Sequence, residues 1–340
     1  MRKLNVLIAG STGYIGLELL KILIRHENLN IKYLCANSSA GKKLSKFENY
    51  FKNKKLPKLI KFNKKLLKDV DVIFTALPVG EAQKISKYLL KRNTLIDLAG
   101  DFRISNSKKF TKWYKKKHKA KNLIKNSIYA LPEITKNKVK NFQILSCPGC
   151  YPTSVLLPLI PLVKNDMIFL DNIVIDSKSG YSGAGRSVHK SYKNKNLYSS
   201  IKAYGISTHK HNAEIDEQLN KYTKKKIKVF FTPHISPMYR GIISTIYLKL
   251  KNNLSSKKVI NKLKKFYKTE KFVKIEKFNK LLSTNDVVNT NYCKISLCKS
   301  RYKNHYIILS VIDNLIKGGS GQAVQNLNLK YNFPKYKGLI

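Results

Sequence analysis

One glycine-spaced turn near the N-terminus constrains the fold more than any other feature of the sequence. An apolar run, "LNVLIA", predicts a buried strand, and "GSTGYIG" follows it at once. In the next stretch, "YIGLELLKILIRH", apolar residues recur every three to four positions, which indicates a helix. A strand, a glycine-rich turn and a helix in this order are typical of the first unit of a dinucleotide-binding domain.

The glycines of this turn have separate roles in such a domain. They allow the tight turn, let backbone N–H groups approach a pyrophosphate, and let the helix pack closely on the strand. The N-terminus of the helix adds positive potential for the phosphates. The spacing is G-x-x-G-x-x-G rather than G-x-G-x-x-G, so the assignment depends mainly on the position of the turn. The cofactor contacts predicted here are Gly10, Ser11, Thr12, Gly13, Tyr14 and Gly16.

The end of the second predicted strand favours NADP(H) over NAD. In NAD-binding domains this strand normally ends in an acidic residue that binds the ribose. Here the sequence is "CANSSAGKK", which contains no carboxylate to repel a 2′-phosphate. Asn37, Ser38 and Ser39 can donate hydrogen bonds, and Lys42 or Lys43 can supply positive charge. We therefore predict NADP(H) as the cofactor and Ser38 as one of its contacts.

Strand and helix patterns alternate through the first half of the chain. Further strands are predicted at "NIKYLCAN", "DVIFTALP", "TLIDLAG" and "FQILSC", with a helix at "GEAQKISKYLLKRN". After residue 150 a helix at "PTSVLLPLIPLV" is followed by clustered, longer strands, and the chain closes with "GGSGQAVQNLNLKY", a glycine-rich loop leading into a helix. We predict an α/β protein with a Rossmann-type parallel sheet covered by helices on both faces, and a second, α+β domain with a mixed or antiparallel sheet.

The charge of the chain is extreme. Its 340 residues include 67 lysines and arginines against 19 acidic residues, a net charge of +48. A nucleic-acid-binding protein is one interpretation. However, the lysines are scattered over the whole length, and no helix-turn-helix, RRM or zinc-finger pattern accompanies them. We favour a compositional bias, and expect salt-dependent, nonspecific attraction of RNA rather than a specific nucleic-acid partner.

The chain is expected to be a cytoplasmic protein without a membrane partner. Its N-terminal apolar run is too short for a signal peptide, and its longest apolar runs fall short of the about 20 residues that a membrane span needs. Five widely spread cysteines argue against a disulfide framework and for a reducing compartment.

The segment "SCPGCYPTS" contains two cysteines in a C-x-x-C arrangement, which suits a redox dithiol, half of a zinc site or a single nucleophile. Cys150 precedes a predicted helix, whose N-terminus lowers the pKa of a thiol. Cys147 ends a strand and lacks that support. A zinc site would need two more ligands, and Cys293 and Cys298 lie within a strand-like stretch. We favour Cys150 as a single nucleophile and predict no metal.

A dinucleotide site combined with an active cysteine suggests hydride chemistry on a thioester formed from a small acyl phosphate. Such chemistry needs a base and a cationic clamp. "STHKHNAEIDEQL" offers His209, His211 and Glu214 within six residues. Arg103 follows the carboxyl end of a strand in "AGDFR", and Arg240 lies between two strands in "HISPMYRG". The arginine fork suits a phosphate or a carboxylate.

With these motifs in place, the chain resembles the N-acetyl-gamma-glutamyl-phosphate reductases, the NADP-dependent enzymes of arginine biosynthesis. The resemblance runs through "GSTGYIG", "IDLAGDFR", "PGCYPT", "DSKSGYSGAGR", "HKHNAEI", "FTPHISPMYRGI" and "IDNLIKGGSGQAVQN", over nearly the whole length. It implies NADPH-dependent reduction of N-acetyl-L-glutamyl 5-phosphate to the 5-semialdehyde with release of phosphate. It also implies a homo-oligomer, either a dimer or a tetramer.

The resemblance further implies roles for single residues. Cys150 would be the nucleophile that carries the thioacyl group. One histidine of "HKH" would be the acid/base; we favour His209, supported by Glu214, and leave His211 to the substrate. The remaining implied contacts are Arg103 and Arg240 with the substrate, and Ser179, Gly180 and Asn314 near the nicotinamide.

The family pattern also suggests the domain boundaries. The C-terminal helix would return to the first domain, which gives an NADP-binding domain over 1–149 and 314–340 and a catalytic and oligomerisation domain over 150–313. The chain departs from the family pattern at Cys147, where asparagine is usual, and at Ser207, Thr208 and Ala213.

Two rival functions remain at this point. The aspartate-semialdehyde dehydrogenases share the chemistry but fit "PGCYPT" and "HKHNAEI" less well, and a basic RNA-binding protein represents a different class.

Structural or surface roles are expected for His26, His118, His189 and His305, while His234 is equally compatible with a site role. Cys35, Cys293 and Cys298 are expected to be small buried residues.

Overall fold

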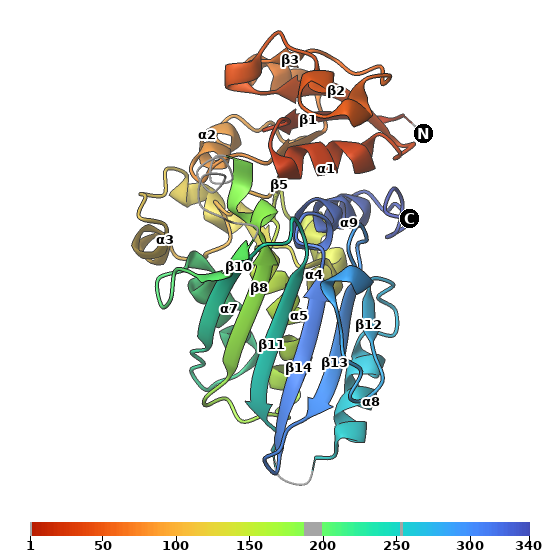
Figure 1. The fold of residues 1–340 in the computed structure, drawn as a ribbon. Helices are drawn as coiled ribbons and strands as arrows, with labels where there is room; N and C mark the ends of the chain where they lie inside the picture. The colour runs from red at the N-terminus through yellow and green to blue at the C-terminus, as the bar shows by residue number, and fades with distance from the viewer. Residues whose placement is uncertain (1, 187–198, 252–253) are drawn as a thin grey trace. The chain divides into compact units, whose positions relative to one another are not determined.

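The computed structural model describes residues 2–186, 199–251 and 254–340, so His189 lies outside the described residues. The chain divides into two compact units. One comprises Met1–Pro148 and Gly319–Ile340, and the other comprises Gly149–Gly318. The chain therefore passes between the units twice, and its C-terminal helix belongs to the first unit (Figure 1).

The first unit is built on a parallel sheet of seven strands in the order β3-β2-β1-β4-β5-β7-β6. Every described pairing in it is parallel. Strands of such sheets are buried on both faces and are therefore apolar throughout. The prediction of a parallel sheet is confirmed. Its strands are β1 (Leu4–Ala9), β2 (Leu29–Cys35), β3 (Leu59–Ile60), β4 (Val72–Thr75), β5 (Thr94–Asp97), β6 (Ser127–Tyr129) and β7 (Ile144–Ser146).

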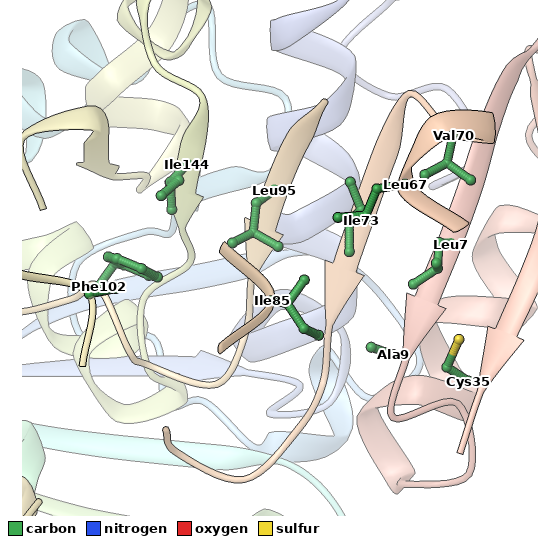
Figure 2. Close-up of a cluster of buried hydrophobic side chains, with 11 residues drawn as sticks. Leu7, Ala9, Cys35, Leu67, Val70, Ile73, Ile85, Leu95, Phe102 and Ile144 are labelled. Carbon is green, nitrogen blue, oxygen red and sulfur yellow. The ribbon is translucent and has the colours of Figure 1, made fainter. Parts of the chain in front are cut away.

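Helices and short 3₁₀ segments cover both faces of this sheet. On one face α1 (Tyr14–Leu23) contacts α9 (Gly321–Lys330), and α9 packs on β5. On the other face, alternate strand residues pack with α2 (Glu81–Ser86) and a 3₁₀ segment (Lys64–Asp69) in the apolar cluster of Figure 2. The other helices of the unit are α3 (Ser107–Tyr114) and α4 (Pro132–Thr135), and further 3₁₀ turns cover Asn37–Ser39, Leu44–Lys46, Asn49–Phe51, Lys121–Asn126 and Lys136–Asn141.

The second unit contains a mixed sheet of seven strands in the order β12-β13-β14-β11-β8-β10-β9. β8 pairs with β10 and β12 with β13 in parallel, and the other pairings are antiparallel. The prediction of a mixed or antiparallel sheet is thus confirmed. Its strands are β8 (Val174–Gly180), β9 (Lys202–Ala203), β10 (Phe230–Ser236), β11 (Ile242–Lys249), β12 (Val273–Ile275), β13 (Cys293–Lys299) and β14 (His305–Ile312).

Three helices lie on one face of this second sheet: α5 (Cys150–Lys164), α7 (Lys210–Leu219) and α8 (Ser256–Phe266) (Figure 1). α5 packs on β11 and β14. A chain of buried hydroxyl groups connects it to the sheet, since the Ser244 hydroxyl lies 2.7 Å from both the Ser154 and the Ser177 hydroxyls. Among the described residues, no helix has the length and apolar character needed to cross a membrane.

Two local predictions were wrong. The helix expected over 80–93 ends at Ser86. Beyond it the Asn93 side chain holds the chain in turns, because it accepts from the N–H of Leu90 and donates to the carbonyls of Leu67 and Val70. The loop expected at "GGSG" is a π-helical turn (Ile316–Ser320) that leads directly into α9. In this turn Gly318 N donates to the carbonyl of Asp313, five residues back, at 2.9 Å.

Candidate active site

Two glycines of the N-terminal turn are required by the packing of the protein itself. Gly10 has φ +91°, and a Cβ atom there would lie 2.2 Å from the carbonyl oxygen of Ala76. A Cβ atom at Gly16 would lie 2.2 Å from the carbonyl oxygen of Gly10. These two positions therefore close the turn and bring α1 against β1.

Gly13 has a different environment. It is the N-cap of α1, and a Cβ atom there would be 3.6 Å from its nearest neighbour, an ordinary contact. The protein's own packing does not require glycine here, which fits a position kept bare so that a pyrophosphate can approach the helix N-terminus. Thr12 and Tyr14 flank it, half-buried. Ser11 is buried, and its hydroxyl donates to the carbonyl of Ile8 at 2.8 Å, so its side chain fixes the turn.

The end of β2 suits a 2′-phosphate. Asn37 and Ser38 are exposed on a 3₁₀ turn directly after the strand, whereas Ser39 is buried. Lys42 and Lys43 are exposed a few residues further on. These donors and cations, with no carboxylate among them, fit NADP(H) as the bound cofactor.

Arg103 is occupied by the backbone of its own unit. Its Nε donates to the carbonyl of Cys147 at 2.7 Å and its Nη2 donates to the carbonyl of Leu98 at 3.0 Å. The side chain is buried. Arg103 therefore braces the strand end that leads toward Cys150.

Two buried carboxyl groups beside Arg103 were not singled out from the sequence, although both lie in the motif "IDLAGDFR". Burial and the neighbouring Asp101 raise the pKa of Asp97 to about 6. Burial also raises the pKa of Asp101, whose carboxylate accepts from the N–H groups of Gly80 and Ala82. The two carboxyl groups hold the loops at the carboxyl end of the sheet.

The sequence predicted a helix just after Cys150. In the second unit α5 begins two residues earlier than expected, with Cys150 as its first residue and Gly149 as its N-cap. The cysteine is half-buried. N–H groups in the first turn of a helix have no intrahelical acceptor, and the helix dipole places positive potential there. A thiolate and a developing oxyanion are both stabilised at such a position.

The imidazole of His211 lies against the residue that precedes Cys150. A Cβ atom at Gly149 would lie 2.3 Å from His211 Nε2, so only glycine leaves room for the ring. Glu214 is fully buried one helical turn after His211. Its Oε1 accepts from Gly149 N at 2.7 Å, and its Oε2 lies 4.0 Å from His211 Nε2. His211, Glu214 and the nucleophile turn thus form one cluster.

His209 occupies a different position. It is the N-cap of α7, and its Nδ1 accepts from the N–H of His211 at 3.1 Å. Its ring packs edge-on against Tyr151 and Tyr204. Burial, with a smaller contribution from Lys210, lowers its pKa to about 4. The sequence favoured His209 over His211 as the acid/base, and the structure brings His211 to Gly149 and Glu214.

Tyr151 and His234 contribute to the wall of this cluster. The Tyr151 hydroxyl donates to the carbonyl of His234 at 2.8 Å, and burial raises the pKa of Tyr151, so the hydroxyl remains protonated. His234 Nδ1 lies 3.1 Å from Asp176 Oδ1, and Asp176 also pairs with Lys178. Since its ring is engaged with Asp176 on β8, we interpret His234 as a structural residue of the sheet.

The residues expected near the nicotinamide contact one another or neighbouring loops of the second unit. A Cβ atom at Gly180 would lie 2.6 Å from the backbone of Tyr239 and Arg240. Asn314 is buried; its Oδ1 accepts from Gly241 N at 2.7 Å and its Nδ2 donates to Ser182 Oγ at 3.0 Å. The Ser179 hydroxyl donates to the carbonyl of Gly180 at 3.0 Å. These contacts order the backbone after β8.

Arg240 is paired within its own unit. Its Nε lies 2.7 Å from Oδ2 of the buried Asp313, and its Nη2 donates to Oδ1 at 3.1 Å. Its Nη1 donates to Asn289 Oδ1 at 2.8 Å. The Asp313 carboxylate balances the charge of Arg240 and fixes the position of its guanidinium.

Cys147 differs sharply from Cys150. It is 1% exposed, and burial raises the pKa of its thiol to about 12, so no thiolate forms near neutral pH. Its Sγ lies 3.7 Å from Asn326 Nδ2.

In 2–186, 199–251 and 254–340, no three His, Cys, Asp or Glu side chains are grouped to hold a metal ion. Of the other cysteines, Cys35 and Cys293 are buried as expected, whereas Cys298 is half-buried.

Sequence reasoning missed one contact of the nucleophile. A Cβ atom at Gly318 would lie 2.7 Å from the Cβ of Cys150, so the π-helical turn packs directly on the cysteine. The paired glycines of "GGSG" were the available signal.

Of the remaining histidines, His26 and His118 are buried structural residues and His305 is exposed.

Comparisons with known proteins agree with this geometry. Residues 5–142 match the NAD-binding domain of the semialdehyde dehydrogenases, and residues 150–314 match their dimerisation domain. The N-acetyl-gamma-glutamyl-phosphate reductase of Thermoanaerobacter pseudethanolicus is 41% identical, over 95% of this chain and 94% of that protein. A probable chloroplastic reductase of the same name from Arabidopsis thaliana is 38% identical, over 100% of this chain and 84% of that protein.

A solved structure gives the same fold. The aspartate semialdehyde dehydrogenase II of Vibrio cholerae superimposes with a TM-score of 0.73 over 98% of this chain and 99% of that one. At 15% identity this likeness concerns the fold alone. The two full-length relatives and the two domain matches show that the chain belongs to the N-acetyl-gamma-glutamyl-phosphate reductase family of oxidoreductases.

Proposed function

We propose that this chain reduces N-acetyl-L-glutamyl 5-phosphate to N-acetyl-L-glutamate 5-semialdehyde with NADPH, and releases phosphate, as a step of arginine biosynthesis. One observation carries the proposal: Cys150 begins α5 while His211 and Glu214 pack on the glycine before it. This arrangement supplies a nucleophile, a base and a group that orients the base.

In the first step the Cys150 thiol transfers its proton to His211, and the thiolate attacks the acyl carbon. The C–S bond forms, the C–O bond to the phosphoryl group breaks, and inorganic phosphate leaves. The N-terminus of α5 stabilises both the thiolate and the negative charge that develops on the carbonyl oxygen.

The thioester is then reduced. The turn from Gly10 to Gly16 would hold NADPH, which would supply the hydride for this reduction. His211 protonates the resulting tetrahedral oxygen and takes that proton back when the C–S bond breaks. The aldehyde then leaves and the Cys150 thiolate is regenerated.

The acid/base role passes from His209 to His211 in this proposal. A general base acts best when its pKa is near the working pH. The pKa of His209, lowered to about 4, is poorly matched to that task, and its Nδ1 is engaged as the cap of α7. Arg103 and Arg240 remain proposed contacts of the substrate's phosphate or carboxylate.

A homo-oligomer is the natural state of a chain with a dimerisation domain. We propose a dimer that forms through the outer face of the second sheet, opposite α5, where Phe230 is 59% and Tyr247 44% exposed. A tetramer would need a second interface in addition.

A cytoplasmic location of the enzyme is part of the same proposal, and cell fractionation tests it.

The activity is tested by following NADPH oxidation with two acyl phosphates, N-acetyl-glutamyl phosphate and aspartyl phosphate. We expect turnover with the acetylated substrate, and in reverse with its aldehyde, phosphate and NADP. Cys150→Ser should abolish turnover, while Cys147→Ser, which changes only the buried thiol, should retain it. Preference for aspartyl phosphate, or activity of Cys150→Ser, would overturn the proposal.

A further inference from the structure

The peptide group between Pro148 and Gly149, directly before Cys150, is bonded at both of its polar atoms by buried side chains. Its N–H donates to Glu214 Oε1 at 2.7 Å, and its carbonyl oxygen accepts from Gln322 Nε2 at 3.2 Å. Both side chains are 0% exposed. Rotating this plane would leave a buried polar group without a hydrogen-bond partner, which is unfavourable.

The orientation of this plane sets the geometry of the nucleophile. Gly149 is the N-cap of α5, with φ −66° and ψ 158°, and the Pro148–Gly149 plane determines the first of these angles. The His211 ring fills the space that a side chain at Gly149 would take. A tilt of the plane therefore moves the Cys150 thiol relative to His211 and to the first-turn N–H groups of α5.

Gln322 comes from a distant part of the chain. It is the second residue of α9, 174 positions after Pro148, and lies just beyond the turn in which Gly318 packs on Cys150. Arg103 Nε donates to the preceding carbonyl, that of Cys147, at 2.7 Å. Two successive carbonyls before the nucleophile are thus bonded to buried side chains.

We infer that Gln322 is a positioning residue for Cys150, which it aligns through the Pro148 carbonyl. The inference rests on the proposed function only in taking Cys150 as the nucleophile. It assigns the amide of Gln322 to the reactivity of the thiol rather than to the binding of substrate or cofactor.

The test replaces Gln322 with methionine, which keeps the volume and removes the amide donor. Gln325→Met is the matched control, because Gln325 is a buried glutamine one turn later in α9 whose Nε2 donates to Glu133 Oε1 at 3.0 Å, away from the nucleophile turn. The readouts are the pH profile of iodoacetamide modification of Cys150, followed by peptide mass, together with kcat, KM and the urea midpoint.

In Gln322→Met we expect the pH midpoint of Cys150 modification to rise and kcat to fall by about ten- to a hundredfold, since small misplacements of reacting groups have effects of this size. The KM values for NADPH and for the acyl phosphate should change little. Gln325→Met should lower the urea midpoint and leave the modification profile unchanged. If both variants lose stability alike and neither shifts the profile, Gln322 is a packing residue and the inference fails.

The modification profile needs no substrate, so it separates this inference from the proposed function. A wild-type chain that is inactive on the acyl phosphate but whose modification profile shifts in Gln322→Met would contradict the function and support the positioning role. Normal turnover by the wild-type chain, with no shift of the modification profile in Gln322→Met, would support the function and contradict the positioning role.

Discussion

At the scale of single residues, the two histidines of "HKH" are distinguished by their surroundings rather than by their chemistry. His211 lies against Gly149 and within 4.0 Å of Glu214. His209 caps α7 through Nδ1, which requires a neutral ring, and its pKa is lowered to about 4. His209 and His211 are only two residues apart at the N-terminus of α7, yet His209 is a capping group and His211 is the proposed catalytic group.

This difference predicts unequal effects of substitution. His211→Gln should lower kcat by about 10²- to 10⁴-fold, the usual contribution of general acid/base catalysis. His209→Asn should reduce kcat far less, because asparagine is a good N-cap and keeps an acceptor for the N–H of His211.

The measurement is the pH–rate profile of each variant in steady state. His211→Gln should lose the limb that reports the base, and His209→Asn should retain it. A larger loss in His209→Asn than in His211→Gln would return the acid/base role to His209.

At the scale of the element, α5 is a helix that contains two prolines, Pro158 and Pro161. A proline inside a helix removes one backbone donor and leaves a carbonyl four residues back without its usual partner. For Pro161 that carbonyl belongs to Leu157, and the Tyr267 hydroxyl donates to it at 2.5 Å. A tertiary contact thus replaces the missing helical hydrogen bond, and α5 extends over 15 residues.

A double-mutant cycle tests this replacement. Tyr267→Phe alone should lower the free energy of unfolding by about 1–3 kcal/mol, because the Leu157 carbonyl stays buried without a partner. In the presence of Pro161→Ala the same change should cost less, since the N–H of the alanine can donate to Leu157. Urea denaturation measures both values, and equal costs in the two backgrounds would refute the idea.

At the scale of the whole molecule, each unit has its own sheet, and the two sheets leave different surfaces. The parallel sheet is covered on both faces. The mixed sheet packs α5 on one face, while on the other the outward positions of β11 include Tyr247 and Lys249, which are exposed. The match of this unit to a dimerisation domain supports a homo-oligomer, and the exposed outer face is the interface that we propose for it.

We therefore predict that Tyr247→Glu shifts the chain toward a monomer. A buried carboxylate without a partner is strongly unfavourable, so the substitution should weaken an interface that covers Tyr247. Tyr302→Glu is the control, because Tyr302 is 76% exposed in a turn outside the strands. Sedimentation velocity distinguishes the species, and an unchanged oligomer in Tyr247→Glu would exclude this face.

The sequence by itself determined the features that depend on local pattern. Residue spacing predicted the parallel sheet, the mixed sheet and a helix just after Cys150, because strand and helix periods are local properties of the chain. The glycine turn at Gly10–Gly16 was recognised from its spacing after a strand, although the Ala76 carbonyl that requires glycine at position 10 comes from a distant segment. Pattern failed over 80–93, where Asn93 bonds to the distant carbonyls of Leu67 and Val70, and at "GGSG", where the π-helical turn packs on Cys150.

Only the tertiary structure decided which residues meet. It brought His211 to Gly149, paired Arg240 with Asp313, and connected Gln322 to Pro148 across 174 positions. It also separated the two cysteines of "SCPGC", because burial raises the pKa of Cys147 to about 12 while Cys150 begins a helix. Contacts between distant residues and the burial of single atoms leave no period in a sequence, so the folded chain alone fixes them.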